Sequence, residues 1–238
     1  EFSLLDGALR IKDAISLAKK QGWKSMAITD HGNIFGAVKF FQEAEKAGIK
    51  PILGAEMYFT DDAKVKDSRN KYYHMVLLVK DAQGYENLCQ LMAYSFLEGF
   101  YFKPRIDQAI LKKYSAGLIA SGGCLGGQIP TLLREGHIAQ AREKIEWFLE
   151  VFGRENFFFE VMAPFDEDQR ITNELLYQYG AEYGIDCVAT GDAHYLSCED
   201  KEAHEVMLSI QTKDTITNPK RYSFGNFQGH LKTTDEML

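Results

Sequence analysis

Hydrophobic positions along the chain follow two alternating patterns. Nearly continuous apolar runs predict strands at residues 26–28, 49–58, 74–79, 117–120, 157–161 and 186–190. Apolar residues that recur at helical spacing predict amphipathic helices from residues 11 and 34, which Gly22 and Gly48 stop. Further helices are expected at 85–96, 139–151, 167–183 and 201–210. Strands therefore alternate with helices along most of the chain.

Strands that read as continuous apolar runs are typical of a parallel sheet covered by helices. The sequence contains no Gly-rich dinucleotide fingerprint and no P-loop, and polar residues stand at the ends of many successive strands. We therefore expect an α/β fold, more specifically a β/α barrel of the TIM type rather than an open sheet. Residues 1–7 are expected to form a loop, residues 60–70 a solvated excursion and residues 100–105 an aromatic-basic loop.

The length and composition of the chain are compatible with a single barrel domain. The 238 residues are 45% hydrophobic, which is enough for one large core. The periodic pattern weakens after residue 212, where Pro219 and several Gly and Asn residues indicate a boundary. We expect a barrel domain at 1–212 and an extended segment at 213–238 that leads toward another domain.

Charge and cysteine content limit the functional class. A net charge of -7 argues against a free-standing, non-specific DNA-binding protein, although a nucleic-acid end could still reach a metal site. No apolar run approaches the length of a membrane span, and no signal peptide is recognisable. The four cysteines lack disulfide-framework and zinc-motif spacing. A cytoplasmic protein without membrane contact is the expectation.

Acids, imidazoles and one thiol stand at the ends of predicted strands. Asp30 and His31 follow the first strand, and Asp192 and His194 follow the last one. Strand ends are where α/β proteins place their chemistry, so these two acid–imidazole pairs are the expected catalytic residues. The complete set of candidate metal ligands is Asp30, His31, Glu56, His74, Cys124, Asp192 and His194.

Each candidate also has a purely structural interpretation. The alternative for Asp30 is a helix cap, and the alternative for His31 and His194 is a position in a surface loop. His74 is alternatively a hydrogen-bonded core histidine, and Cys124 a small buried hydrophobic residue. The set as a whole favours metal binding, because three of the six histidines stand at strand edges. His137 and His204, by contrast, are expected at the surface.

Imidazole, carboxylate and thiolate together suit borderline divalent ions such as zinc, manganese or iron. The set is too large for one ion, so we expect two to three ions with bridging carboxylates, an arrangement used for in-line attack at phosphorus. Glu160 is a further ligand or an orienting residue. Lys103 and Arg105 either contact a phosphate backbone or belong to a salt-bridged surface loop. The glycines at 122, 123, 126 and 127 either approach a phosphate or, preferably, form a tight turn.

Six segments resemble the polymerase and histidinol phosphatase (PHP) domain family. They are EFSLLDG at 1–7, ITDHGN at 28–33, PILGAE at 51–56, YFKPRID at 101–107, SGGCLGG at 121–127 and TGDAHY at 190–195. The KPRID and GCL parts are most similar to the family branch found at the amino terminus of the bacterial DNA polymerase III alpha subunit. LKTTDEM at 231–237 resembles the stretch that leads toward the polymerase palm.

The resemblance implies a distorted seven-stranded barrel and a trinuclear metal centre held by the seven candidate ligands. It also implies a metal-dependent phosphoesterase, acting as a 3′–5′ exonuclease on DNA 3′ ends within a DNA-directed DNA polymerase and beside other replicative holoenzyme subunits. In the family, a strand ending in His-x-His precedes the segment that matches Glu1. We expect this chain to lack that first strand and its two ligands, which would expose strand edges.

Three functions stay open on the sequence alone. The first is a phosphoesterase or proofreading exonuclease, which the intact ligand set favours. The second is a non-catalytic scaffold that stabilises a polymerase and docks a proofreading subunit. The third is a free-standing phosphatase, for example of histidinol phosphate, which the polymerase-like KPR segment disfavours.

Overall fold

The computed structural model describes residues 1–4 and 6–237, so Leu5 of the first loop and Leu238 of the last segment lie outside it. The strands are β1 (Ser25–Ile28), β2 (Lys50–Thr60), β3 (Tyr73–Val79), β4 (Arg105–Asp107), β5 (Leu118–Ser121), β6 (Phe157–Met162) and β7 (Cys187–Thr190). The helices are α1 (Ile11–Lys20), α2 (Ala37–Ala47), α3 (Ala82–Leu97), α4 (Gln108–Lys113), α5 (Gln128–Arg134), α6 (Ile138–Phe152), α7 (Glu167–Tyr183), η1 (Cys198–Asp200), α8 (Lys201–Thr212) and α9 (Thr234–Met237). Every predicted strand and helix is present, with its ends shifted by a few residues.

The sheet is mixed, which corrects the expectation of a wholly parallel one. Its strand order is β1-β2-β3-β5-β6-β7, and β4 pairs with β2. β3 runs antiparallel to both β2 and β5, whereas the other pairs are parallel. The reason lies in residues 61–72, which contain no helix. A parallel return needs a crossover connection, usually a helix, so a chain that turns back without one pairs antiparallel.

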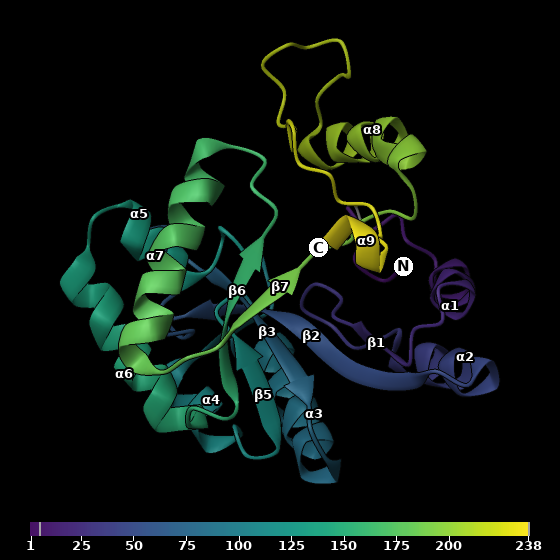
Figure 1. Ribbon diagram of the computed structural model, residues 1–238. Coiled ribbons are helices and arrows are strands. Elements are labelled where there is room, and N and C mark those ends of the chain that lie inside the picture. Colours follow the sequence, from purple (N-terminus) through teal and green to yellow (C-terminus); the bar gives the residue numbers. More distant parts are fainter. Residues whose placement is uncertain (5, 238) are drawn as a thin grey trace.

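The sheet curls into a half-barrel with helices packed around it, and β1 and β7 end its pairing order (Figure 1). The expected barrel-type α/β fold is confirmed in this form. A cavity of about 390 Å³ lies inside the curl, lined by Ala27, Val76, Ala120, Phe158 and Val188. These residues belong to β1, β3, β5, β6 and β7, so the cavity is enclosed by the inner face of the sheet.

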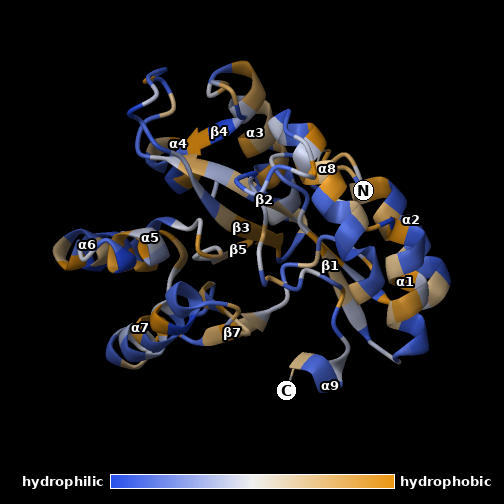
Figure 2. Cartoon of the chain, turned by 90° about the horizontal axis from the view of Figure 1, so that it is seen from above, coloured by the Kyte–Doolittle hydropathy of each residue, from blue (hydrophilic) through white to orange (hydrophobic). Residues whose placement is uncertain are grey.

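Two hydrophobic clusters hold the helices on the sheet. The larger one packs α3, α6 and α7 against the central strands through buried residues such as Leu77, Leu88 and Phe148. The smaller one joins α1 and α2 to β1 through Ile15 and Phe40. β3 and β5 are rich in hydrophobic residues, whereas the helices carry both hydrophobic and hydrophilic residues (Figure 2). β1, α1 and α2, which flank the turn after β1, thus share a small hydrophobic core of their own.

Several short elements were not expected from the sequence. β4 has three residues and lies within the stretch interpreted as an aromatic-basic loop. α4, α5 and α9 are too short to show helical periodicity. Apart from α9, residues 213–237 form no helix or extended strand, in keeping with their weak pattern. None of the described helices has the length and apolarity needed to cross a membrane.

Candidate metal centre

The turn after β1 brings His31 against β2. Gly32 adopts φ 62°, and its N–H donates to the carbonyl oxygen of Glu56 at 2.8 Å. A Cβ at Gly32 would lie 2.9 Å from the ring of Tyr58, so this tight approach requires glycine. His31 and Glu56 consequently form a parallel bridge, which sets their side chains beside each other.

The Glu56 carboxylate lies between two imidazoles. Its Oε1 is 2.5 Å from Nδ1 of His74, and its Oε2 is 3.4 Å from Nδ1 of His31. Burial alone would raise the pKa of Glu56, but the charge on His31 and the hydrogen bond from His74 outweigh it and lower the pKa to about 2. Ligand atoms of Glu56, His74 and Cys124 all lie within 4.8 Å of one another.

A second group of ligand atoms shares His31 with the first. Its members are Asp6, His31 and His194, again within 4.8 Å of one another, and Nε2 of His31 is 3.4 Å from Oδ2 of Asp6. The ring of His31 lies 5.8 Å from that of His194 and 5.9 Å from that of His74, measured between centroids. The two groups therefore form one continuous cluster.

The loop after β7 supplies the last pair. Nδ1 of His194 lies 2.7 Å from the carbonyl oxygen of Asp192 and 3.7 Å from its carboxylate Oδ1. Donation from Nδ1–H to the carbonyl leaves Nε2 with a free lone pair, the form that binds a metal ion. Asp192 adopts φ 43°, a conformation uncommon for a residue other than glycine. Burial raises the pKa of its carboxyl group.

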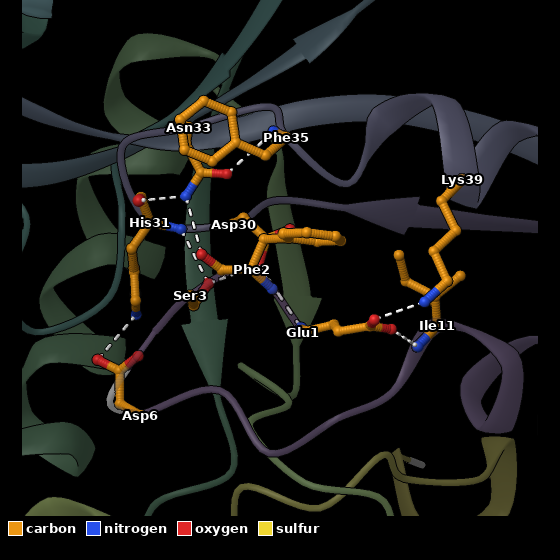
Figure 3. Close-up of polar contacts among 10 residues, drawn as sticks. All are labelled: Glu1, Phe2, Ser3, Asp6, Ile11, Asp30, His31, Asn33, Phe35 and Lys39. Carbon is orange, nitrogen blue, oxygen red and sulfur yellow. Dashed lines mark hydrogen bonds and ion pairs between the residues drawn. The ribbon is translucent and has the colours of Figure 1, made fainter.

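Six of the seven predicted ligands line one cavity of about 700 Å³: His31, Glu56, His74, Cys124, Asp192 and His194. Asp30 lines the 390 Å³ cavity instead, together with His31, Glu56 and Asp192. Its Oδ1 accepts hydrogen bonds from the backbone N–H of Phe2 at 3.2 Å and from Oγ of Ser3 at 2.7 Å, as Figure 3 shows. It belongs to neither group of ligand atoms. Oδ1 of Asp30 thus holds the first residues against the turn, whereas its Oδ2 is buried without a hydrogen-bond partner among the described residues. The ligand and catalytic role of Asp30 stays a prediction.

Asp6 is the member of the cluster that the sequence did not reveal. It lies in the first loop and points toward His31 (Figure 3). Ser3 helps to place this loop, because its Oγ accepts from the backbone N–H of His31 at 3.0 Å. An acid beside Gly7 is too common in loops to mark a ligand, and the signal that could have found Asp6 is its place in the EFSLLDG segment that resembles the PHP family.

The residues of the cluster fit divalent cations. Oδ1 of Asp6 and Nδ1 of His31 are buried without a hydrogen-bond partner among the described residues. Burial, together with Asp192 and Glu56, raises the pKa of the Cys124 thiol well above its usual range. Cations would supply partners for these atoms and reverse the shift, because a coordinating thiol is deprotonated.

The predicted phosphate contacts separate in the structure. Lys103 lines the 700 Å³ cavity, with its Nζ 5.0 Å from the centroid of the Tyr58 ring. Arg105 is fully buried, and its guanidinium donates to the carbonyl oxygens of Gly99, Ala63 and Val65. That burial removes Arg105 from the residues able to meet a phosphate.

Glu160 lies beside the cluster rather than in it. Its carboxylate accepts hydrogen bonds from Ser121 Oγ and Thr190 Oγ1, both at 2.7 Å. Burial outweighs these bonds and raises the pKa of Glu160 to about 7. The glycine segment 122–127 forms a tight turn, since a Cβ at Gly127 would lie 2.0 Å from the carbonyl oxygen of Gly122.

The two remaining predictions for histidines have different outcomes. His137 is exposed, as expected. His204 is only 1% exposed, so the expectation of a surface position was wrong. Its ring packs edge-on against that of His194, with centroids 5.5 Å apart. His204 thus packs against the predicted ligand His194 and helps to hold its ring in place.

Known proteins resemble this chain in sequence and in fold. DNA polymerase III subunit alpha of Borreliella burgdorferi is 43% identical over 241 residues, covering 100% of this chain and 21% of that protein. The subunit of Thermus aquaticus is 41% identical over 244 residues, with 100% and 20% covered. The chain therefore spans about a fifth of these relatives.

A structural comparison agrees on the fold. A candidate metal-dependent phosphoesterase from Bifidobacterium adolescentis superposes with a TM-score of 0.52 at 13% identity, over 79% of this chain and 84% of that one. The family model of the PHP domain matches residues 1–164. The chain therefore belongs to the PHP domain family.

Proposed function

We propose that this chain is the PHP domain of a bacterial DNA polymerase III alpha subunit and that its cluster is a metal-dependent phosphoesterase site acting on DNA 3′ ends. The observation that carries the proposal is the shared position of His31, which joins two groups of ligand atoms into one cluster. Similarity to alpha subunits over the whole chain supports the setting. In that setting the protein works in the cytoplasm with other subunits of the replicative holoenzyme.

The proposed ligands are Asp6, His31, Glu56, His74, Cys124, Asp192 and His194. Two to three divalent ions of zinc, manganese or iron, when bound, supply an activated water and stabilise charge on the phosphate oxygens. Glu56 would hold cations beside both His31 and His74, because its two oxygens face different imidazoles. Asp192 holds His194 in the tautomer that leaves Nε2 free.

The cavity walls suit a nucleotide. Lys103 contributes a positive charge for a phosphate, and aromatic side chains offer faces on which a base can stack: Tyr58, Tyr72, Tyr222, Phe224 and Phe227. Tyr222 is 57% exposed and Tyr72 is 40% exposed, so both are accessible. We also propose that residues 213–238 lead from the domain at 1–212 toward a following domain.

A nuclease assay tests the proposal. The chain, loaded with Mn²⁺ or Zn²⁺, should release nucleotides from the 3′ end of single-stranded DNA labelled at its 5′ end. His31→Ala should abolish release, while the matched variant His137→Ala, at an exposed position, should retain it. Wild-type protein that releases no nucleotides, or that cleaves histidinol phosphate instead, would contradict the proposal.

An exposed apolar patch favours a second candidate function, docking of a proofreading subunit. Phe35 and Val38 are each 66% exposed, and Leu97 is 84% exposed. The ring centroids of Phe35 and Phe96 lie 6.2 Å apart, so the patch spans the segments before and within α2 and the end of α3. Val38→Asp with Leu97→Asp should weaken capture of that subunit and leave metal content unchanged.

A further inference from the structure

The chain returns to the loop that carries His194 after a long excursion. Residues 229–231, called the strap here, pair with residues 194–195. The backbone N–H of His194 donates to the carbonyl oxygen of Gly229 at 2.7 Å, and that of Leu231 donates to the carbonyl oxygen of Tyr195 at 3.0 Å. The strap therefore holds the backbone of His194 in place.

Three metal-binding side chains converge where the strap meets this loop. They are Cys198 from η1, His230 from the strap and Glu236 from α9, and their ligand atoms lie within 4.8 Å of one another. None of the three belongs to the cluster around His31. Each comes from a different segment, so helical or turn periodicity does not explain their meeting.

The distances suit a tetrahedral ion. Nε2 of His230 is 3.2 Å from Oε1 of Glu236. Two ligand atoms bound to one zinc ion at 2.0–2.1 Å with tetrahedral angles are about 3.3 Å apart. The pair is thus already spaced as two ligands are, and Sγ of Cys198 lies within 4.8 Å of a ligand atom of each.

The imidazole of His230 has an unmet requirement. The residue is 5% exposed, and Nδ1 has no hydrogen-bond partner among the described residues. With Nε2–H donated to Glu236, the buried lone pair of Nδ1 faces no donor. A cation on Nε2 would replace the proton shared with Glu236 and move the ring proton to Nδ1, so the unpartnered Nδ1 does not itself point to the ion.

Hydrogen bonds orient the carboxylate of Glu236 as a ligand. Its Oε2 accepts from the backbone N–H of Thr233 at 2.8 Å and from Oγ1 of Thr233 at 2.9 Å. These bonds fix the carboxylate and leave Oε1 directed to His230. The nearby positive charge is Lys232, whose Nζ is bonded to the carbonyl oxygen of Gln228.

We propose that Cys198, His230 and Glu236 form a second cation site, separate from the cluster around His31, for a thiophilic divalent ion such as zinc. Thiolate, imidazole and carboxylate with one open position match the donor set that zinc accepts. An ion there ties η1, the strap and α9 together and so fixes the hydrogen bonds that hold His194. The inference does not depend on the proposed nuclease function, because it is read out by ion binding.

Cadmium titration tests the site, because thiolate-to-cadmium charge transfer absorbs in the ultraviolet. Cys124→Ser removes the thiol of the first cluster, so a thiolate band that remains reports on another cysteine. We expect this band in the Cys124→Ser variant. In Cys124→Ser/Cys198→Ser, we expect the band to disappear and one ion per chain to be lost with it. The matched control, Cys124→Ser/Cys89→Ser, should keep both the band and the ion.

Thermal unfolding gives a second readout. Added Zn²⁺ should raise the melting temperature of Cys124→Ser by several degrees and that of Cys124→Ser/Cys198→Ser much less. Cys198 is exposed, so serine there leaves packing intact and both variants should fold. Equal bands, equal stoichiometry and equal melting shifts in the two variants would overturn the proposal.

Discussion

Oε2 of Glu56 lies 3.4 Å from Nδ1 of His31, across the boundary between β2 and the turn after β1. The other oxygen of this carboxylate is engaged by His74. One buried negative charge therefore connects three segments of the half-barrel edge. The proposed function depends on this arrangement.

Glu56→Gln should disable the cluster. It removes the charge between two imidazoles, so the pKa of His74 should fall and metal affinity should drop by about 10–100-fold or more. Titration of the His74 ring by NMR and metal analysis after dialysis check both effects. Glu155→Gln, at an exposed position, should change neither quantity, and a Glu56→Gln protein with full metal content would count against the ligand role.

Asp6 and Asp30 should respond differently to substitution. Asp6→Asn should lower metal stoichiometry with little change in stability, since the cluster loses a ligand charge. Asp30→Ala should retain the ions but lose about 1–3 kcal/mol of stability, because the N–H of Phe2 and the hydroxyl of Ser3 lose a buried acceptor. Urea unfolding and metal analysis of both variants decide the assignment, and the reverse pattern would restore Asp30 as the ligand.

Substitutions of Lys103 and Arg105 should also have different effects. Lys103→Ala should weaken DNA binding and reduce the slope of log affinity against log salt by about one, as expected for one lost phosphate contact. Arg105→Met should destabilise the fold by about 3 kcal/mol or more, because it leaves buried carbonyl oxygens without donors. If Lys103→Ala left the salt slope unchanged, the phosphate contact would have to be abandoned.

Glu160 predicts how stability varies with pH. Its pKa of about 7 in the fold is above the ordinary value of 4.5, so the folded state binds this proton more tightly than the unfolded chain. Stability should therefore fall as pH rises from about 4.5 to 7, by up to about 3 kcal/mol from this group. Glu160→Gln should remove that fall.

Urea unfolding at pH 5 and pH 8, with a chelator present to remove cations, measures the effect. The wild-type protein should be less stable than Glu160→Gln at pH 8 and nearly equal to it at pH 5. Glu155→Gln serves as the exposed control. A constant difference between Glu160→Gln and wild type across this range would show that the carboxyl group titrates normally.

The strands and long helices could be predicted because each buries a continuous run or a periodic face. The direction of β3 could not, since it is set by the helix-free connection at 61–72 and not by the residues of the strand. β4 is three residues long and carries Arg105, whose burial depends on three carbonyl groups supplied by other segments.

The candidate site shows the same limit. Asp192 and His194 are two residues apart and line the same cavity, so their proximity followed from their spacing, while their role as ligands stays a prediction. Asp30 and His31 are adjacent, and neighbouring side chains in extended backbone point to opposite sides. The groups of ligand atoms include His31 and not Asp30. Asp6 joins through folding of the first loop, which no local pattern encodes.

The most direct test is the anomalous scattering of Mn²⁺ in crystals of the metal-loaded chain. We predict at least two peaks in the 700 Å³ cavity, with His31 and Glu56 at coordination distance and Asp30 beyond it. A cavity without peaks, or ions bound only elsewhere, would contradict the metal centre and the function proposed from it.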